Sequence, residues 1–346
     1  MIRKSYFFSI FILLFVLAIG FTLPPKRKIV WPEKVYNEKN NPPSFQKKEL
    51  GRLLFYDPIL SSDNTISCSS CHLSYTAFTH TDHAVSHGVF DRVGKRNAPA
   101  LFNLGWKKNF MWDGSIHSLD AQSMAPIENV LEMNETLANV VKKLNERKFY
   151  RDYFFNAWGD SLATGERVLK SLSQFMLSFV SNSSKYDEVL AGTNSFSAQE
   201  KKGYALFQQK CNACHTEPLF TNDAFMSNGL ALNDSLQDIG RGSVTHLKSD
   251  ERLFKVPSLR NIEMSFPYMH DGRFRTLQQV MNHYESIQGN EENISSSLNH
   301  SLNLTSNDKQ DLIAFLLTLT DHNFLTRKEF QFPQNLQHEI IQRTHP

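Results

Sequence analysis

Two short cysteine motifs carry the strongest chemical signal in the sequence. They are Cys68-Ser-Ser-Cys71-His72 and Cys211-Asn-Ala-Cys214-His215, and together they contain all four cysteines of the 346-residue chain. In a C-x-x-C-H unit the two thiols bind the vinyl groups of a porphyrin, and the following histidine reaches the iron. The pattern therefore predicts two covalently bound haem c groups, with His72 and His215 as proximal iron ligands.

Two other uses of paired cysteines fit the sequence less well. A single zinc site would join pairs that are 140 positions apart, from Cys71 to Cys211, whereas zinc modules usually bring such pairs within about 20 residues. A thioredoxin-type pair belongs on a strand-to-helix turn of a βαβ unit, which the sequence lacks. Covalent haem is the interpretation that uses both cysteine pairs and both histidines.

The N-terminus has the layout of an export signal. Arg3 and Lys4 precede an apolar run over residues 6–21, and two prolines follow it. A charged start before an apolar segment is typical of a secretory signal, although this run is also close to the length of a short membrane span. Residues 1–25 are therefore predicted to be a signal peptide or an N-terminal anchor of a periplasmic protein. Residues 26–44, rich in Pro, Asn and charge, are predicted to be an extended linker.

The composition excludes several classes of protein. Lys and Arg number 37 and Asp and Glu number 35, giving a formal charge of +2. Nucleic acid is therefore not an expected partner, because nucleic-acid binding needs a concentrated basic surface. Hydrophobic residues make up 40% of the chain, which is a globular composition. At roughly 100 to 200 residues per domain, the length suggests two domains.

An internal repeat divides the chain. Residues 98–119 align with residues 256–277 without a gap, at an offset of 158 positions. The identical pairs are Pro99 and Pro257, Leu101 and Leu259, Asn103 and Asn261, Met111 and Met269, Asp113 and Asp271, Gly114 and Gly272, and Leu119 and Leu277. Strand signals are scarce and the long periodic segments are helical. We predict an all-α fold with two tandem cytochrome c-like domains, 45–192 and 193–346, each around one covalent haem.

The two copies of the repeat differ where chemistry would be expected. Trp112 in the first copy stands where His270 stands in the second. Beyond the aligned block, the first copy continues to Gln122 and Glu132, and the second continues to Tyr284. Two haems that are attached alike but surrounded differently are expected to perform different tasks.

These motifs resemble those of the bacterial di-haem cytochrome c peroxidases and their MauG-like relatives. The resemblance rests on the two C-x-x-C-H units and on residues 111–114 (MWDG), 120–133 (DAQSMAPIENVLEM) and 255–272 (KVPSLRNIEMSFPYMHDG). It runs from about residue 45 to residue 320. It implies an exported two-domain enzyme in which the N-terminal haem reacts with hydrogen peroxide, the C-terminal haem stores or relays an electron, and calcium lies between the domains.

The resemblance also implies roles for individual residues. Trp112 matches the tryptophan that couples the two haems, and Gln122 and Glu132 match a pair on the open face of the peroxidatic haem. A carboxylate over the iron moves a proton from one peroxide oxygen to the other as acid and base. His87 is the best candidate for the displaceable distal histidine of the same haem.

Calcium and the second haem have candidate ligands of their own. Asn97 and the backbone carbonyls of Ser265 and Pro267 match the calcium ligands, and oxygen donors suit that ion. Tyr284 lies 14 positions beyond His270, where the peroxidases have an axial methionine, and MauG-like oxidases use a tyrosine there. Met281, His283 and a simple packing role for Tyr284 remain open alternatives.

The function expected from the sequence is reduction of hydrogen peroxide with electrons from a small redox protein, either a cytochrome c or a copper protein. One alternative is a MauG-like oxidase acting on a residue of a partner protein, and another is a non-catalytic di-haem electron carrier. A carrier has no use for a proton-transferring Glu132 at one haem only. The oligomeric state stays open between a monomer and a homodimer.

Overall fold

The computed structural model of the protein describes residues 30–289, 293–298 and 300–344, so the predicted signal peptide or anchor lies outside the described residues. This part of the chain is rich in helices, and its only named strands are β1 (Phe225–Met226) and β2 (Phe254–Lys255), paired antiparallel. The predicted all-α class agrees with this content. None of the described helices is long and apolar enough to cross a bilayer.

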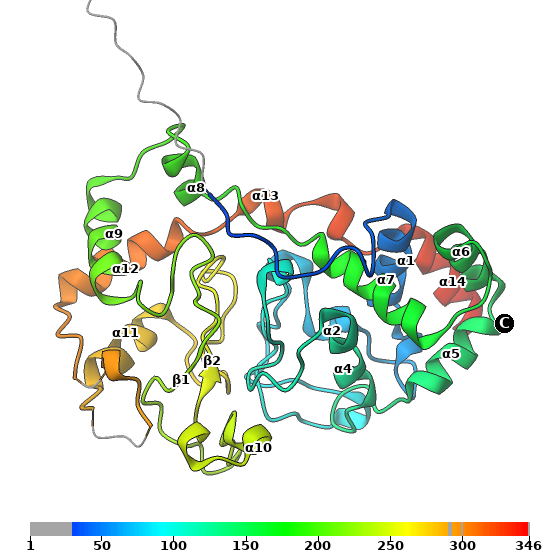
Figure 1. The fold of residues 1–346 in the computed structure, drawn as a ribbon, viewed down its shortest axis with the longest axis horizontal. Coiled ribbons are helices and arrows are strands. Elements are labelled where there is room, and N and C mark those ends of the chain that lie inside the picture. Colours follow the sequence, from blue (N-terminus) through cyan, green and yellow to red (C-terminus); the bar gives the residue numbers. More distant parts are fainter. Residues whose placement is uncertain (1–29, 290–292, 299, 345–346) are drawn as a thin grey trace, which may run out of the picture.

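Figure 1 shows the helices in two groups that lie side by side. One group consists of α1 (Phe45–Tyr56), α2 (Cys68–Cys71), α3 (Leu119–Gln122), α4 (Met124–Glu128), α5 (Leu137–Asn145), α6 (Lys148–Trp158), α7 (Gly165–Leu177) and α14 (Gln334–Thr344). The other group consists of α9 (Ala198–Lys210), α10 (Gly242–Thr245), α11 (Leu277–Ser286) and α12 (Ser306–Leu317). The short helices α8 (Lys185–Leu190) and α13 (His322–Leu325) lie at the top of the view.

One close helix pair organises each group. In the first group α1 packs on α7, and a Cβ added at Gly51 would lie 1.9 Å from the carbonyl oxygen of Ser171. In the second group α9 packs on α12, and a Cβ at Gly203 would lie 1.8 Å from the carbonyl oxygen of Asp311. Each helix pair therefore needs a glycine at its crossing point.

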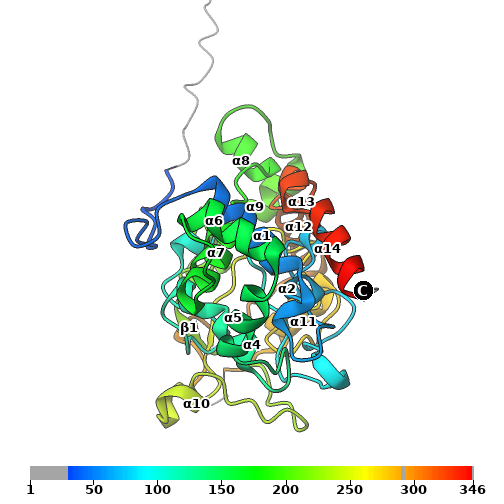
Figure 2. The same ribbon diagram turned by 90° about the vertical axis from the view of Figure 1, so that its right-hand side faces the viewer.

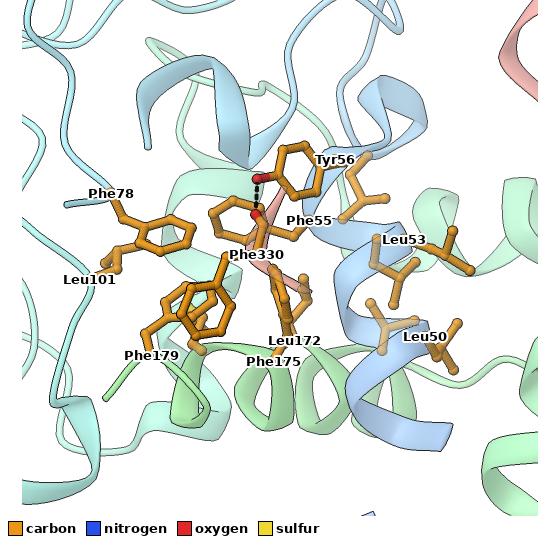
Figure 3. Packing of buried hydrophobic residues seen from close by; sticks show 14 of the residues in the cluster. Leu50, Leu53, Phe55, Tyr56, Phe78, Leu101, Leu172, Phe175, Phe179 and Phe330 are labelled. Carbon is orange, nitrogen blue, oxygen red and sulfur yellow. Dashed lines mark hydrogen bonds between the residues drawn. The ribbon is translucent and has the colours of Figure 1, made fainter. Parts of the chain in front are cut away.

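The first hydrophobic core is built from aromatic side chains around α1 and α7. Phe55, Phe175 and Phe179 pack edge to face, and Phe78 stacks on Phe179 with ring centroids 3.8 Å apart (Figure 3). Such contacts between rings add to the gain from burying their area. This core positions the C-terminal end of α1, from which the chain continues toward the first C-x-x-C-H unit.

The two cores do not follow the predicted domain boundary in two places. The C-terminal segment, predicted to belong to the second domain, contributes Phe330 and Leu336 to the first core, and Tyr56 donates a hydrogen bond to the carbonyl oxygen of Phe330 (Figure 3). Figure 2 shows this end of the molecule, with α14 beside the first group of helices. Conversely, Tyr186 of α8 belongs to the second core. The apolar face of each of these helices shows that it must be covered by a core. It does not show which of the two cores covers it.

The predicted repeat is visible in the backbone. Positive φ angles recur at three equivalent pairs: Asn103 and Asn261 (54° and 55°), Met111 and Met269 (66° and 76°), and Gly114 and Gly272 (70° and 66°). Isolated bridges also recur at the same offset, between Phe110 and Ile116 and between Tyr268 and Phe274. Left-handed conformations are costly outside glycine, so their recurrence shows that the two copies share one backbone path.

Candidate active site

A first cavity brings together most of the residues predicted for peroxide chemistry. Its lining includes Cys71, His72, Trp112, Gln122 and Glu132. Cys71 is the last residue of α2, Gln122 ends α3, and Glu132 lies on the loop after α4. Three separate segments of the first copy thus converge on one space with a proximal histidine and a carboxylate.

His72 is oriented as a proximal ligand would be. Its Nδ1 lies 2.7 Å from the carbonyl oxygen of Phe78, whose φ of 59° is left-handed. Burial lowers the pKa of His72 to about 4, although the hydrogen bond to Phe78 opposes this shift. A neutral imidazole that donates from Nδ1 keeps the lone pair of Nε2 available for a metal. The residue fits haem iron as its partner.

A second cavity surrounds the other C-x-x-C-H unit. Its lining includes Cys211, Cys214, His215 and Tyr284. Nδ1 of His215 lies 3.1 Å from the carbonyl oxygen of Pro257 and 3.3 Å from that of Phe220. Burial lowers the pKa of His215 to about 4. Phe220 has a φ of 55° and plays the part that Phe78 plays in the first copy.

The thiols do not have the properties of a redox pair. Burial raises the pKa of Cys68 to about 12, that of Cys71 to about 11 and that of Cys211 to about 12. Thioredoxin-type cysteines instead need a lowered thiol pKa, because the thiolate is the reactive form. Thiols with raised pKa values beside neutral histidines fit covalent haem attachment better than disulfide exchange.

Glu132 is held in place by its own loop. Asn129 donates a hydrogen bond from Nδ2 to Oε1 of Glu132 over 3.0 Å, and the carbonyl oxygen of Asn129 accepts from the backbone N–H of Glu132. The segment at Gly88 presses on this loop, because a Cβ there would lie 2.3 Å from the carbonyl oxygens of both Leu131 and Glu132. Burial raises the pKa of Glu132, while the hydrogen bond from Asn129 lowers it in part. A half-buried carboxylate with a raised pKa is suited to acid-base work near neutral pH.

Trp112 joins the cavities. A third, middle cavity shares lining residues with each of the other two, and Trp112 is the one described residue that lines all three. The indole Nε1 donates to the carbonyl oxygen of Asn97 over 2.9 Å, and the carbonyl oxygen of Trp112 accepts from the N–H of Lys255 over 2.8 Å. The ring is therefore fixed at the junction between the two copies, as a residue that couples two haems would need to be.

The three predicted calcium residues share the middle cavity. Asn97, Ser265 and Pro267 all line it, although they are far apart in the sequence. The Nδ2 of Asn97 donates to the carbonyl oxygen of Ala84 over 3.0 Å, which leaves its amide oxygen available. The described residues contain no cluster of three His, Cys, Asp or Glu side chains suited to a metal. A calcium site here would depend on amide and backbone oxygens, and it stays a prediction.

His87 is not brought into the first cavity. Its ring packs on His83 with centroids 4.0 Å apart, and His83 packs on His80 at 4.9 Å. Among the described residues, Ser86 rather than His87 lines the His72 cavity. The backbone of His87 is close to the haem-binding turn, since Sγ of Cys71 lies 3.7 Å from its carbonyl oxygen. A distal role for His87 stays a prediction that needs rotation of this side chain.

Tyr284 lies in the second cavity on α11. Burial raises the pKa of its hydroxyl to about 12, and a hydrogen bond with Asn228 lowers it in part. Met281 lines the same cavity, whereas Sδ of Met269 accepts from Nδ2 of Asn228 over 3.3 Å, and Nε2 of His283 lies 2.9 Å from the carbonyl oxygen of Asn228. Tyr284 and Met281 thus share the cavity with His215, while His283 is engaged at the backbone of Asn228.

Sequence reasoning missed several residues that the structure places at these sites. Asn129 and Asn228 hold the candidate side chains Glu132 and Tyr284, and Lys107 and Lys255 line the middle cavity. Asn129 and Lys255 lie within the family-like segments, so their position was a usable signal. Asn228 and Lys107 have no such signal, because only folding brings them to the site.

The fold and the site together define the class of protein: a helix-rich protein of the c-type haem class, with a C-x-x-C-H unit at each of two cavities and a carboxylate, Glu132, in the lining of one of them. A family model described as di-haem cytochrome c peroxidase matches residues 45–195. The chain is 37% identical to the methylamine utilization protein MauG of Methylorubrum extorquens over 299 residues, covering 83% of this chain and 82% of the relative. It is 33% identical to the cytochrome c551 peroxidase of Nitrosomonas europaea over 284 residues, covering 81% of each.

A solved structure agrees with the sequence relatives. It is described as a MauG-like protein associated with microbial copper homeostasis, with a TM-score of 0.77, 30% identity, and coverage of 91% of this chain and 99% of that one. The chain therefore belongs to the di-haem cytochrome c peroxidase and MauG-like family, and it is an oxidoreductase. Membership implies two c-type haems.

Proposed function

We propose that the protein is a periplasmic enzyme that reduces hydrogen peroxide at the haem held by Cys68, Cys71 and His72. The observation that carries this proposal is that Glu132 and Gln122 share one cavity with His72. When bound, the haem supplies the iron that binds peroxide and passes electrons to it. The described residues that line the cavity of the second C-x-x-C-H unit include no Asp or Glu, which supports assigning peroxide chemistry to the first.

The protein's own residues would manage the proton. Glu132 would accept a proton from one peroxide oxygen and deliver it to the other, which would leave as water when the O–O bond breaks. Two electrons from the donor protein and two protons from solvent would convert the remaining oxygen to a second water. The proton transfer by Glu132 requires a carboxyl group whose pKa is close to the working pH, and burial raises the pKa of Glu132 toward that range. Asn129 keeps the carboxylate in one orientation, and the amide of Gln122 on the same cavity wall provides a further hydrogen-bonding group.

The electrons would enter through the second half. Trp112 lies between the cavities of His72 and His215, so it is the natural connection for electron transfer between the two haems. We assign the electron donor to a small redox protein, a cytochrome c or a copper protein, as expected from the sequence. The calcium ion proposed at Asn97, Ser265 and Pro267 would stabilise the same junction.

A second candidate function is favoured by Tyr284. Its side chain shares the cavity with His215, and a tyrosine oxygen as axial ligand stabilises oxidised iron and lowers the potential of the haem. A low-potential second haem favours oxidation of a residue on a partner protein, as in MauG-like oxidases, over acceptance of electrons from a cytochrome.

One experiment tests both candidates. The purified di-haem protein is mixed with hydrogen peroxide, and its absorbance is followed with and without reduced cytochrome c. Catalytic oxidation of the cytochrome supports the peroxidase. A rapid spectral change that is long-lived and does not oxidise the cytochrome supports the MauG-like candidate. No reaction with peroxide in either mixture contradicts the proposal as a whole.

A further inference from the structure

Two lysine side chains lie in the middle cavity, between the two haem cavities. Lys107 follows the short 3-10 helix Leu104–Trp106, and Lys255 is the last residue of β2. Both line the middle cavity, and Lys255 also lines the cavity of His215. Lys255 is only 9% exposed. Neither lysine has been given a role by the motifs or by the proposed peroxide chemistry.

The polypeptide does not balance the charge of these lysines. Nζ of Lys255 lies 3.7 Å from Oδ1 of Asp223, and this carboxylate is the one acidic group that acts on both lysines. Nζ of Lys107 has no hydrogen bond or ion pair with any described residue. Burial, and then repulsion from Lys255, lowers the pKa of Lys107 to about 7. When both lysines are protonated, two ammonium groups share one carboxylate, so an added anion would favour the protonated form of Lys107.

A cation that is partly removed from water and has no close partner is stabilised when an anion accompanies it. We propose that Lys107 and Lys255 bind the propionate carboxylates of the two haems and so form a cationic clamp between them. This inference rests on the haem sites of the proposed function, but it concerns lysines that the proposed function does not use.

The positions of the cysteines favour propionates as the anions. Thioether bonds fix the vinyl edge of each haem at its cysteines, and the propionates lie on the opposite edge of the porphyrin. No cysteine is among the described residues that line the middle cavity. The cavity nevertheless shares Trp112 and Gln122 with the His72 cavity, and Trp112 and Lys255 with the His215 cavity. Propionates from both sides can therefore reach it without the cysteine edges doing so.

The clamp has an electrostatic consequence for the haems. Reduction adds a negative charge to a haem, so a nearby ammonium group stabilises the reduced state and raises the midpoint potential. For charges about 10 Å apart at an effective dielectric constant of about 20, one unit of charge changes the ratio of reduced to oxidised haem by slightly more than tenfold. Because the N–H of Lys255 also binds the carbonyl oxygen of Trp112, the cation and the coupling residue are positioned by the same strand.

The test is a redox titration of the di-haem protein followed by its absorbance. Lys107→Met and Lys255→Met keep most of the side-chain volume and remove the charge. At least one haem in each variant should shift to a lower midpoint potential, by about tenfold in the ratio of reduced to oxidised haem, which is about 59 mV for one electron. Lys107→Arg and Lys255→Arg should retain the wild-type potentials, because the charge is kept. Lys108→Met is the matched control, since Lys108 is an exposed neighbour.

Mass spectrometry must show two haems in each protein that is compared. Unchanged potentials in both methionine variants would overturn the clamp, and so would equal shifts in the methionine and arginine variants. If a methionine variant does not mature, the arginine variant of the same lysine should mature with normal potentials, and failure of both arginine variants would also count against the clamp. The peroxide reaction of the wild type is measured separately, so loss of the proposed function and loss of the clamp give different results.

Discussion

Replacing Glu132 by glutamine is the sharpest test of the proposed peroxide chemistry. In the structure, Oε1 of Glu132 accepts a hydrogen bond from Asn129 over 3.0 Å, and a glutamine can offer the same acceptor from the same position. The substitution therefore removes the basicity of the side chain while keeping its volume and its orienting contact. Both haem spectra should remain as in the wild type.

The rate of the reaction with peroxide should fall strongly. General acid-base assistance is typically worth about 100-fold to 10,000-fold, which corresponds to roughly 2.7 to 5.4 kcal/mol of barrier at about 1.36 kcal/mol per tenfold. The assay is stopped-flow mixing of the di-haem protein with peroxide, recorded at the haem absorbance. Glu128→Gln on α4 is the control, because Glu128 is exposed on the same segment and should leave the rate unchanged.

The pH dependence gives an independent readout. Burial raises the pKa of Glu132, and only the ionised carboxylate can accept the proton from peroxide. The wild-type rate should therefore decline as the pH falls through this raised pKa, and Glu132→Gln should lack that decline. Asn129→Leu removes the donor that lowers the pKa, so the decline should move to higher pH. A Glu132→Gln variant with the wild-type rate and pH profile would refute the reasoning.

Four further predictions follow from the haem sites and the helix crossings. Mass spectrometry of protein matured in a host that attaches haem c should show a gain of two haems, and a gain of one or none contradicts the assignment. Tyr284→Phe should raise the potential of the second haem and change its magnetic circular dichroism if the oxygen is a ligand, whereas identical potentials and spectra would leave Tyr284 as a packing residue. Gly203→Ala should lower the free energy of unfolding by about 1 to 3 kcal/mol because its Cβ meets backbone, whereas Gly105→Ala, whose nearest contact is 3.4 Å away, should have little effect in the same denaturant titration. Gly88→Ala should displace the loop of Glu132 and slow the peroxide reaction without loss of haem, and a normal rate would show that the loop absorbs the methyl group.

Haem attachment and the internal repeat were predictable because each can be recognised from short stretches of the sequence alone. A C-x-x-C-H unit contains its own attachment chemistry, and the offset of 158 positions appears in an ungapped alignment. The acceptors of the proximal histidines were not predictable. Phe78 and Phe220 act through backbone carbonyls, which any residue possesses, so their side chains reveal nothing about this role.

The remaining features depend on which surfaces meet in three dimensions. Its position in the sequence assigns the C-terminal segment to the second domain, whereas α14 packs on the first core through Leu336. Lys107 and Lys255 are 148 positions apart, and each alone resembles an ordinary exposed lysine. Only the shared cavity shows that the two cations act on each other.

Both copies of the repeat contact the backbone of one residue, Asn97, but they do so through different groups. Trp112 and His270 occupy equivalent positions of the repeat, and both bind the backbone of Asn97: the indole of Trp112 donates to its carbonyl oxygen, and the carbonyl oxygen of His270 accepts from its N–H. In the first copy the aromatic ring is directed to the junction, whereas the ring of His270 stacks on Phe254 at 3.7 Å. A symmetric duplication would have placed two equal rings there. Among the described residues, Trp112 is instead the one ring that borders all three cavities, which is the position needed by the proposed electron path between a peroxide-reacting haem and an electron-supplying haem.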